Sequence, residues 1–147
     1  MKIELSIHEI LVATQVGILR QCEDIKANKK PFIGEKKELG WQRHIEGALS
    51  ECAMAKYLNV YWNKSPWFNP DVGDIEVRTT HYDTGRLIIR DRDKDDTKYY
   101  LLTGLNGTYH VRGYMYARDA KQAKYLDAPV EGRPASYYVP QSDLRMG

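Results

Sequence analysis

Acidic side chains gather in one short stretch of this 147-residue chain. Asp71 follows a proline, and Asp74 and Glu76 come three and five positions later. Mg²⁺ prefers oxygen ligands and usually binds one or two carboxylates together with water and substrate phosphate. An ion held in this way can activate water and neutralise charge on a phosphodiester during hydrolysis. The stretch therefore predicts a divalent-metal site suited to phosphate esters.

These acids lie next to or within a strand that we expect over residues 72–80. Side chains alternate between the two faces of a strand, so Asp74, Glu76 and Arg78 are expected to share one face. The isoleucine and valine between them are expected to pack on the other face. Two acids and a base on one side also describe an ordinary exposed strand, and the pattern alone leaves this alternative open.

Glu51 is the second acidic position of interest, on a helix that we expect over residues 41–58. Its neighbours on the adjacent turns are small or apolar: Gly47, Ala48, Met54 and Ala55. A carboxylate drawn toward packed surface is costly unless it is paired or bound to a metal. We therefore expect Glu51 either to form an ion pair with an arginine or to take part in the site.

The order of these residues resembles the pattern of the PD-(D/E)XK nuclease superfamily, in which a helix glutamate precedes Pro-Asp and then Glu-x-Lys. This sequence reads Glu51, Pro70-Asp71 and Glu76-Val77-Arg78, and its surroundings are similar to short uncharacterised phage and bacterial members. The resemblance covers roughly residues 41–116. It implies an α/β, restriction-endonuclease-like core with a mixed central β-sheet flanked by helices.

The resemblance also implies roles for the residues that match the pattern. Asp71, Glu76 and the backbone carbonyl of Val77 are expected to bind Mg²⁺ or Mn²⁺. Glu51 is expected to hold a metal-bound water or a second ion, and Arg78 takes the place of the lysine. The catalytic set is thus Glu51, Asp71, Glu76 and Arg78.

Two departures from the pattern affect these roles. Asp71 and Glu76 are closer in sequence than in many members, where a hairpin intervenes, so Asp74 is an alternative ligand. Arg78 stays protonated and cannot act as a base. Its guanidinium can still bind a phosphate oxygen through its fork of donors.

The expected function is a metal-dependent nuclease that hydrolyses DNA phosphodiester bonds. The alternative is a catalytically inactive nucleic-acid-binding or phage accessory protein on the same fold. A structural or interaction module without nucleic acid is a further alternative. By analogy with small nuclease cores, a homodimer is expected to act on DNA, and no membrane partner is expected.

Several lysines are candidates for contact with DNA phosphates. They lie in a polar loop and on a short helix that we expect near the C-terminus: Lys29, Lys30, Lys36, Lys37, Lys121 and Lys124. Phosphate contacts supply much of the affinity of DNA-binding proteins. Lysines at such positions are also commonly just solvated, so this alternative stays open.

The element pattern predicts one domain over residues 1–147. It divides into an N-terminal helix and basic loop (1–40), a core (41–116) and a C-terminal helix and tail (117–147). Ser6 and Glu9 form a capping-box pattern that begins the first helix, which is expected to end near residue 22 or a little beyond. The other expected elements are strands at 86–90, 99–103 and 109–116, a type I′ turn at Asn106-Gly107, a helix at 120–125 capped by Asp119, and an edge strand at 136–139.

The overall composition fits a soluble globular protein. The net charge of +2 does not suit a histone-like binder, although a local basic patch can still hold DNA. Cys22 and Cys52 are too few and too far apart for a disulfide framework, and we expect both to be buried and reduced. With no apolar run of membrane-spanning length and no signal-peptide pattern, a cytoplasmic location is expected.

Overall fold

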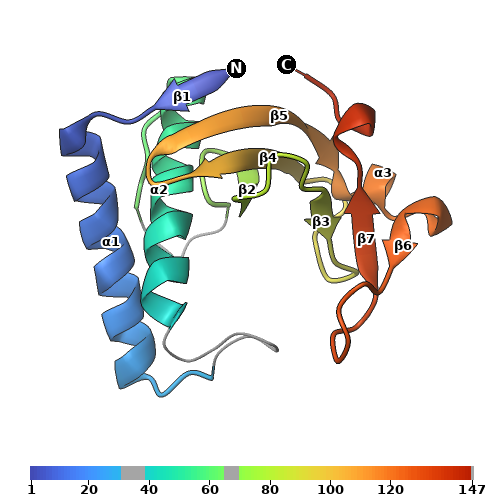
Figure 1. Cartoon of the computed structure of the whole chain (residues 1–147), viewed down its shortest axis with the longest axis horizontal. Helices are drawn as coiled ribbons and strands as arrows, with labels where there is room; N and C mark the ends of the chain where they lie inside the picture. Colours follow the sequence, from blue (N-terminus) through green and yellow to red (C-terminus); the bar gives the residue numbers. More distant parts are fainter. Residues whose placement is uncertain (31–38, 65–69, 147) are drawn as a thin grey trace.

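The computed structural model describes residues 1–30, 39–64 and 70–146. Within these residues, two long helices pack together beside a four-stranded mixed sheet, and a three-stranded antiparallel sheet lies toward the opposite side of the molecule (Figure 1). The protein is therefore a mixed α/β protein. The described residues contain no helix that is both long and apolar enough to span a membrane.

The described elements follow the chain in a simple order. They are β1 (Lys2–Glu4), α1 (Ile7–Lys26), α2 (Gly40–Leu58), β2 (Ile75–Thr80), β3 (Leu87–Ile89), β4 (Lys98–Leu105), β5 (Thr108–Tyr116), α3 (Ala117–Ala120), the 3₁₀ turn η2 (Ala123–Tyr125), β6 (Leu126–Asp127), β7 (Ser136–Val139) and the 3₁₀ turn η3 (Gln141–Asp143).

The beginning of α1 confirms the predicted capping box. The hydroxyl of Ser6 accepts a hydrogen bond from the Glu9 amide at 3.2 Å, and the Glu9 carboxylate accepts one from the Ser6 amide at 2.7 Å. The helix continues to Lys26, a little beyond residue 22, as the sequence allowed. Cys22, expected to be buried, lies exposed on this helix, whereas Cys52 is half-buried; both are free thiols.

Helices α1 and α2 approach closely at Gly17. A Cβ atom added to Gly17 would lie 2.5 Å from the Cα of Ile45 on α2, so the absence of a side chain lets the two backbones meet. Helix α2 is in turn fixed to the hairpin that joins β4 and β5. The Glu46 carboxylate accepts hydrogen bonds from the Asn106 amide at 3.0 Å and from the Tyr109 hydroxyl at 2.6 Å.

The four-stranded sheet has the order β1-β5-β4-β2. The β4–β5 hairpin turns at Asn106 and Gly107, whose positive φ angles of 55° and 94° agree with the predicted type I′ turn. β2 runs parallel to β4 and forms one edge of the sheet, while β1 is antiparallel to β5 at the other edge. This mixture of directions agrees with the predicted mixed sheet.

The two faces of this sheet support two separate cores, as strand alternation requires. On β4, Tyr100 and Leu102 are buried in the core shared with α1 and α2. Tyr99 and Leu101 point the other way, into a core with Leu87 and Val139 of the second sheet. The expected arrangement of helices on both flanks is therefore only half right, because β-strands cover most of the second face.

The C-terminal region differs from the sequence expectation in two ways. The expected helix at 120–125 is replaced by the short helix α3 (Ala117–Ala120) and the separate turn η2 (Ala123–Tyr125), so Asp119 lies within α3 instead of capping a helix. The strand at 136–139 forms, but it lies in the middle of the sheet β3-β7-β6 and not at its edge. One of its two partners, β3, comes from a distant part of the chain, which local patterns do not reveal.

We expect Gly17→Ala to destabilise the protein by about 1–3 kcal/mol, because the added methyl group overlaps the α2 backbone. Gly47→Ala is the matched control: it lies in α2 with nothing within 4 Å of the added Cβ, and it should raise stability by about 0.5–1 kcal/mol. Urea denaturation followed by circular dichroism measures both. Equal effects of the two substitutions would contradict the close helix contact.

Candidate functional site

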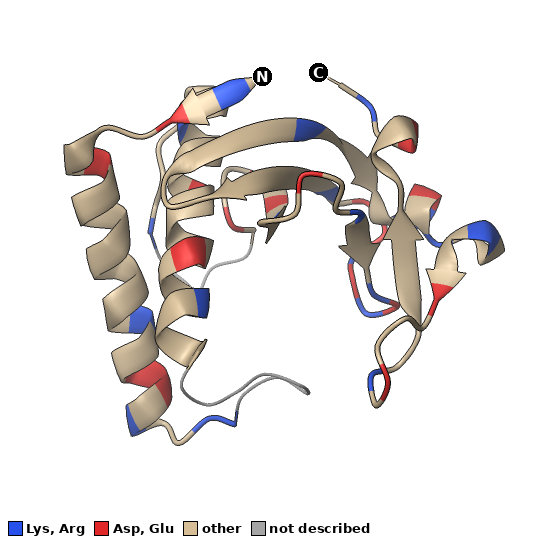
Figure 2. Ribbon diagram, viewed as in Figure 1, with Lys and Arg blue, Asp and Glu red and all other residues tan. Residues whose placement is uncertain are grey.

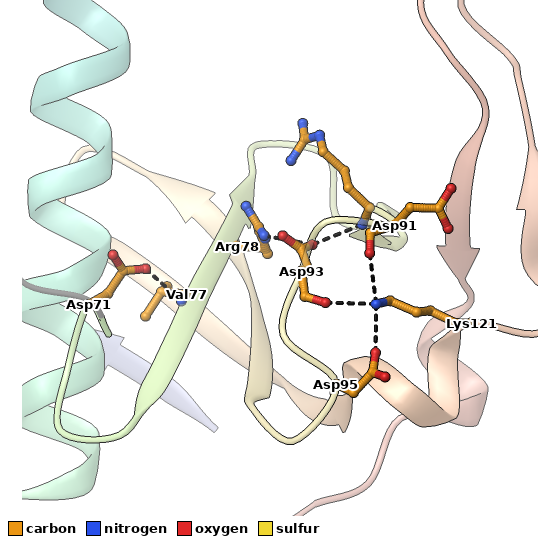
Figure 3. Close-up of polar contacts among 8 residues, drawn as sticks. Asp71, Val77, Arg78, Asp91, Asp93, Asp95 and Lys121 are labelled. Carbon is orange, nitrogen blue, oxygen red and sulfur yellow. Dashed lines mark hydrogen bonds and ion pairs between the residues drawn. The ribbon is translucent and has the colours of Figure 1, made fainter.

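Asp71 is held at the exposed edge of β2. A tight turn precedes the strand, with the Val72 and Ile75 backbones exchanging hydrogen bonds of 3.2 and 2.9 Å around Gly73 at φ +57°. The turn brings the Asp71 carboxylate back along the strand, where it accepts a hydrogen bond from the Val77 amide at 2.9 Å (Figure 3). An edge strand has amides without a neighbouring strand, and this carboxylate satisfies one of them.

Glu76 lies beside Asp71. Burial, a hydrogen bond to the Asp71 side chain and the charge of Asp71 together raise the pKa of Glu76 to about 8. Two hydrogen-bonded carboxyl groups share one proton, because ionising both in partly buried surroundings is energetically unfavourable. The structure therefore brings together two of the predicted metal ligands as a carboxyl pair.

Asp74 does not share the face of Glu76, and this expectation is wrong. The strand begins at Ile75, so Asp74 falls in the preceding turn, where its side chain is exposed. The charge of Asp74 helps to raise the pKa of Tyr100, a residue of the face that packs against the helices. The charges of Glu76 and Arg78 instead influence the pKa of Tyr99, which lies on the opposite face. The turn at Gly73 interrupts the alternation that the prediction assumed.

Glu51 forms a buried ion pair with an arginine, one of the two alternatives that the sequence left open. Two nitrogens of Arg20 donate to its two oxygens at 2.8 and 2.9 Å, and the Trp62 indole donates at 3.3 Å. Their side chains are 9% and 12% exposed for Arg20 and Glu51. Burial raises the pKa of Glu51 and the Asp71 charge acts in the same direction, although the Arg20 hydrogen bonds oppose this.

Arg78 is paired with an acid that the sequence did not single out. Its guanidinium donates to Asp93 at 2.9 Å and lies 4.9 Å from the centre of the Tyr99 ring. The same Asp93 oxygen accepts a hydrogen bond from the Arg90 amide at 2.8 Å. The Arg78 Nε is buried and has no hydrogen-bond partner among the described residues. Asp93 thus fixes the position of Arg78 on the face that also carries Glu76.

Lys121 holds the loop that carries Asp93. Its ammonium group donates to the backbone oxygens of Asp91 and Asp93 at 2.9 and 2.7 Å, and to the Asp95 carboxylate at 2.6 Å (Figure 3). An ammonium group has three protons to donate, and these contacts use all of them. Lys121 therefore supports this loop, and its contact with nucleic acid stays a prediction.

The other candidate lysines are spread over the surface. Lys29 and Lys30 follow α1 and are exposed, and Lys29 lies 3.5 Å from the Asp24 carboxylate. Lys124 is exposed in η2, with its ammonium 4.9 Å from the Tyr125 ring centre. Lys36 and Lys37 lie outside the described residues.

Several arginines lie near Arg78, the arginine whose charge acts on Glu76. Burial lowers the pKa of Arg90, and the positive charges of Arg78, Arg92 and Arg133 lower it further, with Asp93 opposing them. Within the described part of the chain, the half-buried Arg90 guanidinium has no hydrogen bond or ion pair of its own. The signal was present as the Arg90-Asp-Arg92 sequence, but its proximity to Arg78 depends on the fold.

A cavity of about 570 Å³ lies on the helix side of β2. Its walls include Ser50 and Glu51 of α2, Val77 and Thr79 of β2, and Arg133 from the loop before β7. The cavity therefore opens beside Glu51 and the Val77 backbone, whereas Glu76 and Arg78 point to the other face of the strand. Asp71 stands at the strand edge between these two regions.

A complete three-acid metal cluster is not formed. Among the described residues, no group of three or more histidine, cysteine, aspartate and glutamate side chains is arranged to hold a metal ion. Asp71 and Glu76 lie together, and the charge of Asp71 helps to raise the pKa of Glu51. Asp74 lies outside this group. The arrangement supplies two carboxyl groups, with Arg20 neutralising the third.

Comparison of the chain with protein-family models, with curated proteins and with solved structures gave no match in any of the three.

We expect the metal-free protein to lose stability as the pH rises from about 5 to 8. Unfolded Glu76 releases its proton near pH 4.5, whereas folded Glu76 keeps it until about pH 8, so the folded state binds more protons between these values. Glu76→Gln should remove much of this loss, and Asp74→Asn in the exposed turn should not. Urea denaturation in the presence of a chelator, repeated across this pH range, measures the effect. An unchanged slope for Glu76→Gln would show that the two carboxyl groups do not share a proton.

Proposed function

We propose that this protein is a metal-dependent nuclease that hydrolyses DNA phosphodiester bonds on a restriction-endonuclease-like fold. One observation carries the proposal: the Asp71 and Glu76 carboxyl groups meet at the edge of β2, within electrostatic reach of the Arg78 guanidinium. Paired carboxyl groups suit a divalent cation, and neighbouring guanidinium groups suit the phosphates of its substrate.

The donor set fits Mg²⁺ or Mn²⁺ as a two-carboxylate site. Mg²⁺ usually takes one or two carboxylates and fills its other positions with water and phosphate, so a third acidic ligand is not required. The proton shared by Asp71 and Glu76 marks a place where positive charge is stabilised. When bound, the metal would supply an activated water and neutralise developing charge on the phosphate.

Arg78 and Arg90 are the chain's own groups for the phosphate. Arg78 has no role as a base, because its guanidinium stays protonated. Asp93 and Tyr99 hold it in a fixed orientation, which limits the reorganisation needed to bind an anion. Arg90 brings a second guanidinium that makes no ion pair among the described residues. Together they would bind the phosphate beside the carboxyl pair.

Glu51 has a different place in this proposal from the one implied by the family pattern. Its two oxygens already accept hydrogen bonds from Arg20, so it is not a free ligand for a second ion. It lies close to Asp71 and places a neutralised ion pair behind that residue. We infer that Glu51 orients the acid pair through Arg20 and does not contact the metal.

Three features of the fold support a restriction-endonuclease-like core. α2 carries Glu51 and packs against the sheet, β2 carries Glu76 and Arg78, and β2 pairs in parallel with β4. These features support a restriction-endonuclease-like core over residues 41–116. The three-stranded sheet that covers its second face would then be an addition to that core.

The non-catalytic alternative is favoured by the two ion pairs. Glu51 is engaged by Arg20 and Arg78 by Asp93, so two of the four expected catalytic residues already have partners. A protein that had lost catalysis would keep such pairs for stability and bind nucleic acid through its arginines.

A cleavage experiment with linear, nicked, branched and single-stranded DNA in Mg²⁺ and Mn²⁺ separates the two functions. If the carboxyl pair binds the metal, Glu76→Gln should lower cleavage by about 100-fold or more, since loss even of a residue that only supports a metal ligand commonly costs about 10–100-fold. Asp74→Asn should retain cleavage, because Asp74 lies outside the pair. DNA binding without cleavage by the wild-type protein in either metal would favour the non-catalytic alternative.

The arginine group has its own test in DNA affinity. Arg90→Gln should weaken binding of DNA and reduce the slope of log affinity against log salt by about 1, because one phosphate contact is lost. Arg86→Gln removes the same charge from a residue that lies over Tyr138 and near Asp127, and it should leave the slope unchanged. Fluorescence anisotropy over a range of salt concentrations gives both slopes. Equal slopes for the two variants would place the DNA elsewhere on the protein.

A further inference from the structure

The cavity on the helix side of β2 borders the candidate site. Its walls include Glu51, on which the charge of Asp71 acts, and Val77, whose amide donates to the Asp71 carboxylate. Its volume of about 570 Å³ lies in the range of pockets that hold small molecules, about 300–1,000 Å³. A double helix is too wide for such a volume, whereas one unpaired nucleotide is not. A ligand in the cavity would lie next to the carboxyl pair.

Gly47 leaves open space on the α2 wall of this cavity. A Cβ atom added to Gly47 would have no neighbouring atom within 4 Å. Glycine in the middle of a helix is less stable than alanine, and here no close helix contact requires it, in contrast to Gly17. The space in front of the α2 backbone is therefore available to a ligand.

Two of the lining residues end in flat groups, the imidazole of His81 and the guanidinium of Arg43. Bases of unpaired strands stack on rings and on guanidinium planes. An arginine that donates hydrogen bonds at its edge still presents its face, so the ion pair of Arg43 with Asp24 at 3.7 Å is compatible with stacking. These walls suit a planar ring system.

Polar groups for the edge of a base are also present. The Gln42 amide and the Thr79 hydroxyl belong to lining residues, and neither side chain has a hydrogen bond within the part of the chain that the structure describes. Both groups can donate and accept, which matches the mixed donors and acceptors along a base edge. Leu39 and Leu105 add apolar contact to the same walls.

The charges in the walls favour the base, and not the phosphate, as the part that enters. Acidic and basic residues lie close together on α2 (Figure 2), and Glu46 is one of the acids that line the cavity. Its hydrogen-bond donors are an amide and a hydroxyl, which leave its charge unneutralised. A phosphate inside would be repelled, whereas an uncharged base would not. Arg133 lines the cavity and its charge also acts on Arg90, so it offers the phosphate a place toward the arginines.

We propose that the cavity binds one unpaired base of a DNA strand, and that the substrate of the proposed nuclease is single-stranded DNA or the unpaired strand at an end or a branch. The inference rests on the proposed DNA cleavage and adds the class of substrate. A base in a duplex is stacked and paired, so it must leave the helix before it can enter a protein pocket. A strand that is already unpaired avoids this energetic cost.

Binding of strands with and without bases tests the proposal. The probes are a labelled single strand of about 12 thymidine nucleotides and an abasic strand of the same length, both in a chelator without metal. Wild-type protein should bind the thymidine strand about 10-fold more tightly, because stacking of one base contributes affinity of this order. Both strands carry the same phosphates, so repulsion by the metal-free carboxyl pair cancels in this ratio. Fluorescence anisotropy measures both affinities.

Gly47→Leu fills the space in front of α2 and should lower the affinity for the thymidine strand about 10-fold, to that for the abasic strand. Gln15→Leu is the matched control: it adds the same side chain at an exposed position of α1 outside the cavity, and it should keep the wild-type preference. Gln42→Ala removes an amide without adding volume and should reduce the preference to a smaller degree. Circular dichroism checks folding, which leucine in place of a helix glycine should favour.

Equal binding of the two strands by wild-type protein, or an unchanged preference in folded Gly47→Leu, would overturn the proposal. Cleavage in Mg²⁺ or Mn²⁺ tests the class of substrate: the thymidine strand should be cut about 10-fold faster than its duplex with adenine. Equal cleavage rates would contradict this class of substrate while leaving the protein a nuclease. A base preference without cleavage in either metal would support the cavity as a base site and contradict the nuclease proposal.

Discussion

The buried ion pair between Arg20 and Glu51 connects the helical layer to the candidate site. Two hydrogen bonds join α1 to α2, and Arg20 also donates to the Lys64 backbone carbonyl at 3.3 Å. Because both charges are almost removed from water, loss of one partner would leave the other unpaired at a cost of about 3–5 kcal/mol. Asp71 lies within electrostatic reach of both residues. The contact that locks the helices together therefore also sets the surroundings of the carboxyl pair.

The edge position of β2 explains how groups from both sides of a sheet come to act at one place. Val77 faces the helices, Glu76 and Arg78 face the second sheet, and Asp71 reaches the strand from its open edge. A strand in the middle of the sheet would have its amides paired on both sides and no room for such a carboxylate. On the far side, Lys121 holds the loop of Asp93, which in turn holds Arg78. The candidate site is thus supported by contacts from each layer of the protein.

Local structure was predictable where neighbouring residues supply the energy. The capping box at Ser6, the turn at Asn106-Gly107 and the helix ending at Leu58 each depend on interactions within a few residues, and each was expected. The start of β2 was misplaced because the positive φ of Gly73 makes a turn inside an alternating pattern. The central position of β7 was also missed, since it depends on β3 and β6, which lie outside its own segment. Strand order depends on tertiary packing and cannot be predicted from the local sequence.

The sequence by itself determined which groups are available: acids at 51, 71 and 76, an arginine at 78, and an apolar periodicity along the first helix. Tertiary structure decided how they are paired. Arg20 and Glu51 are 31 positions apart, and Asp93 is 15 positions from Arg78, so no spacing rule connects them. Folding also decided that one apolar face of α1 packs on α2 while the other stays exposed. The physical reason is that charge pairing and burial depend on distances in space, whereas helix periodicity and turn geometry depend on distances along the chain.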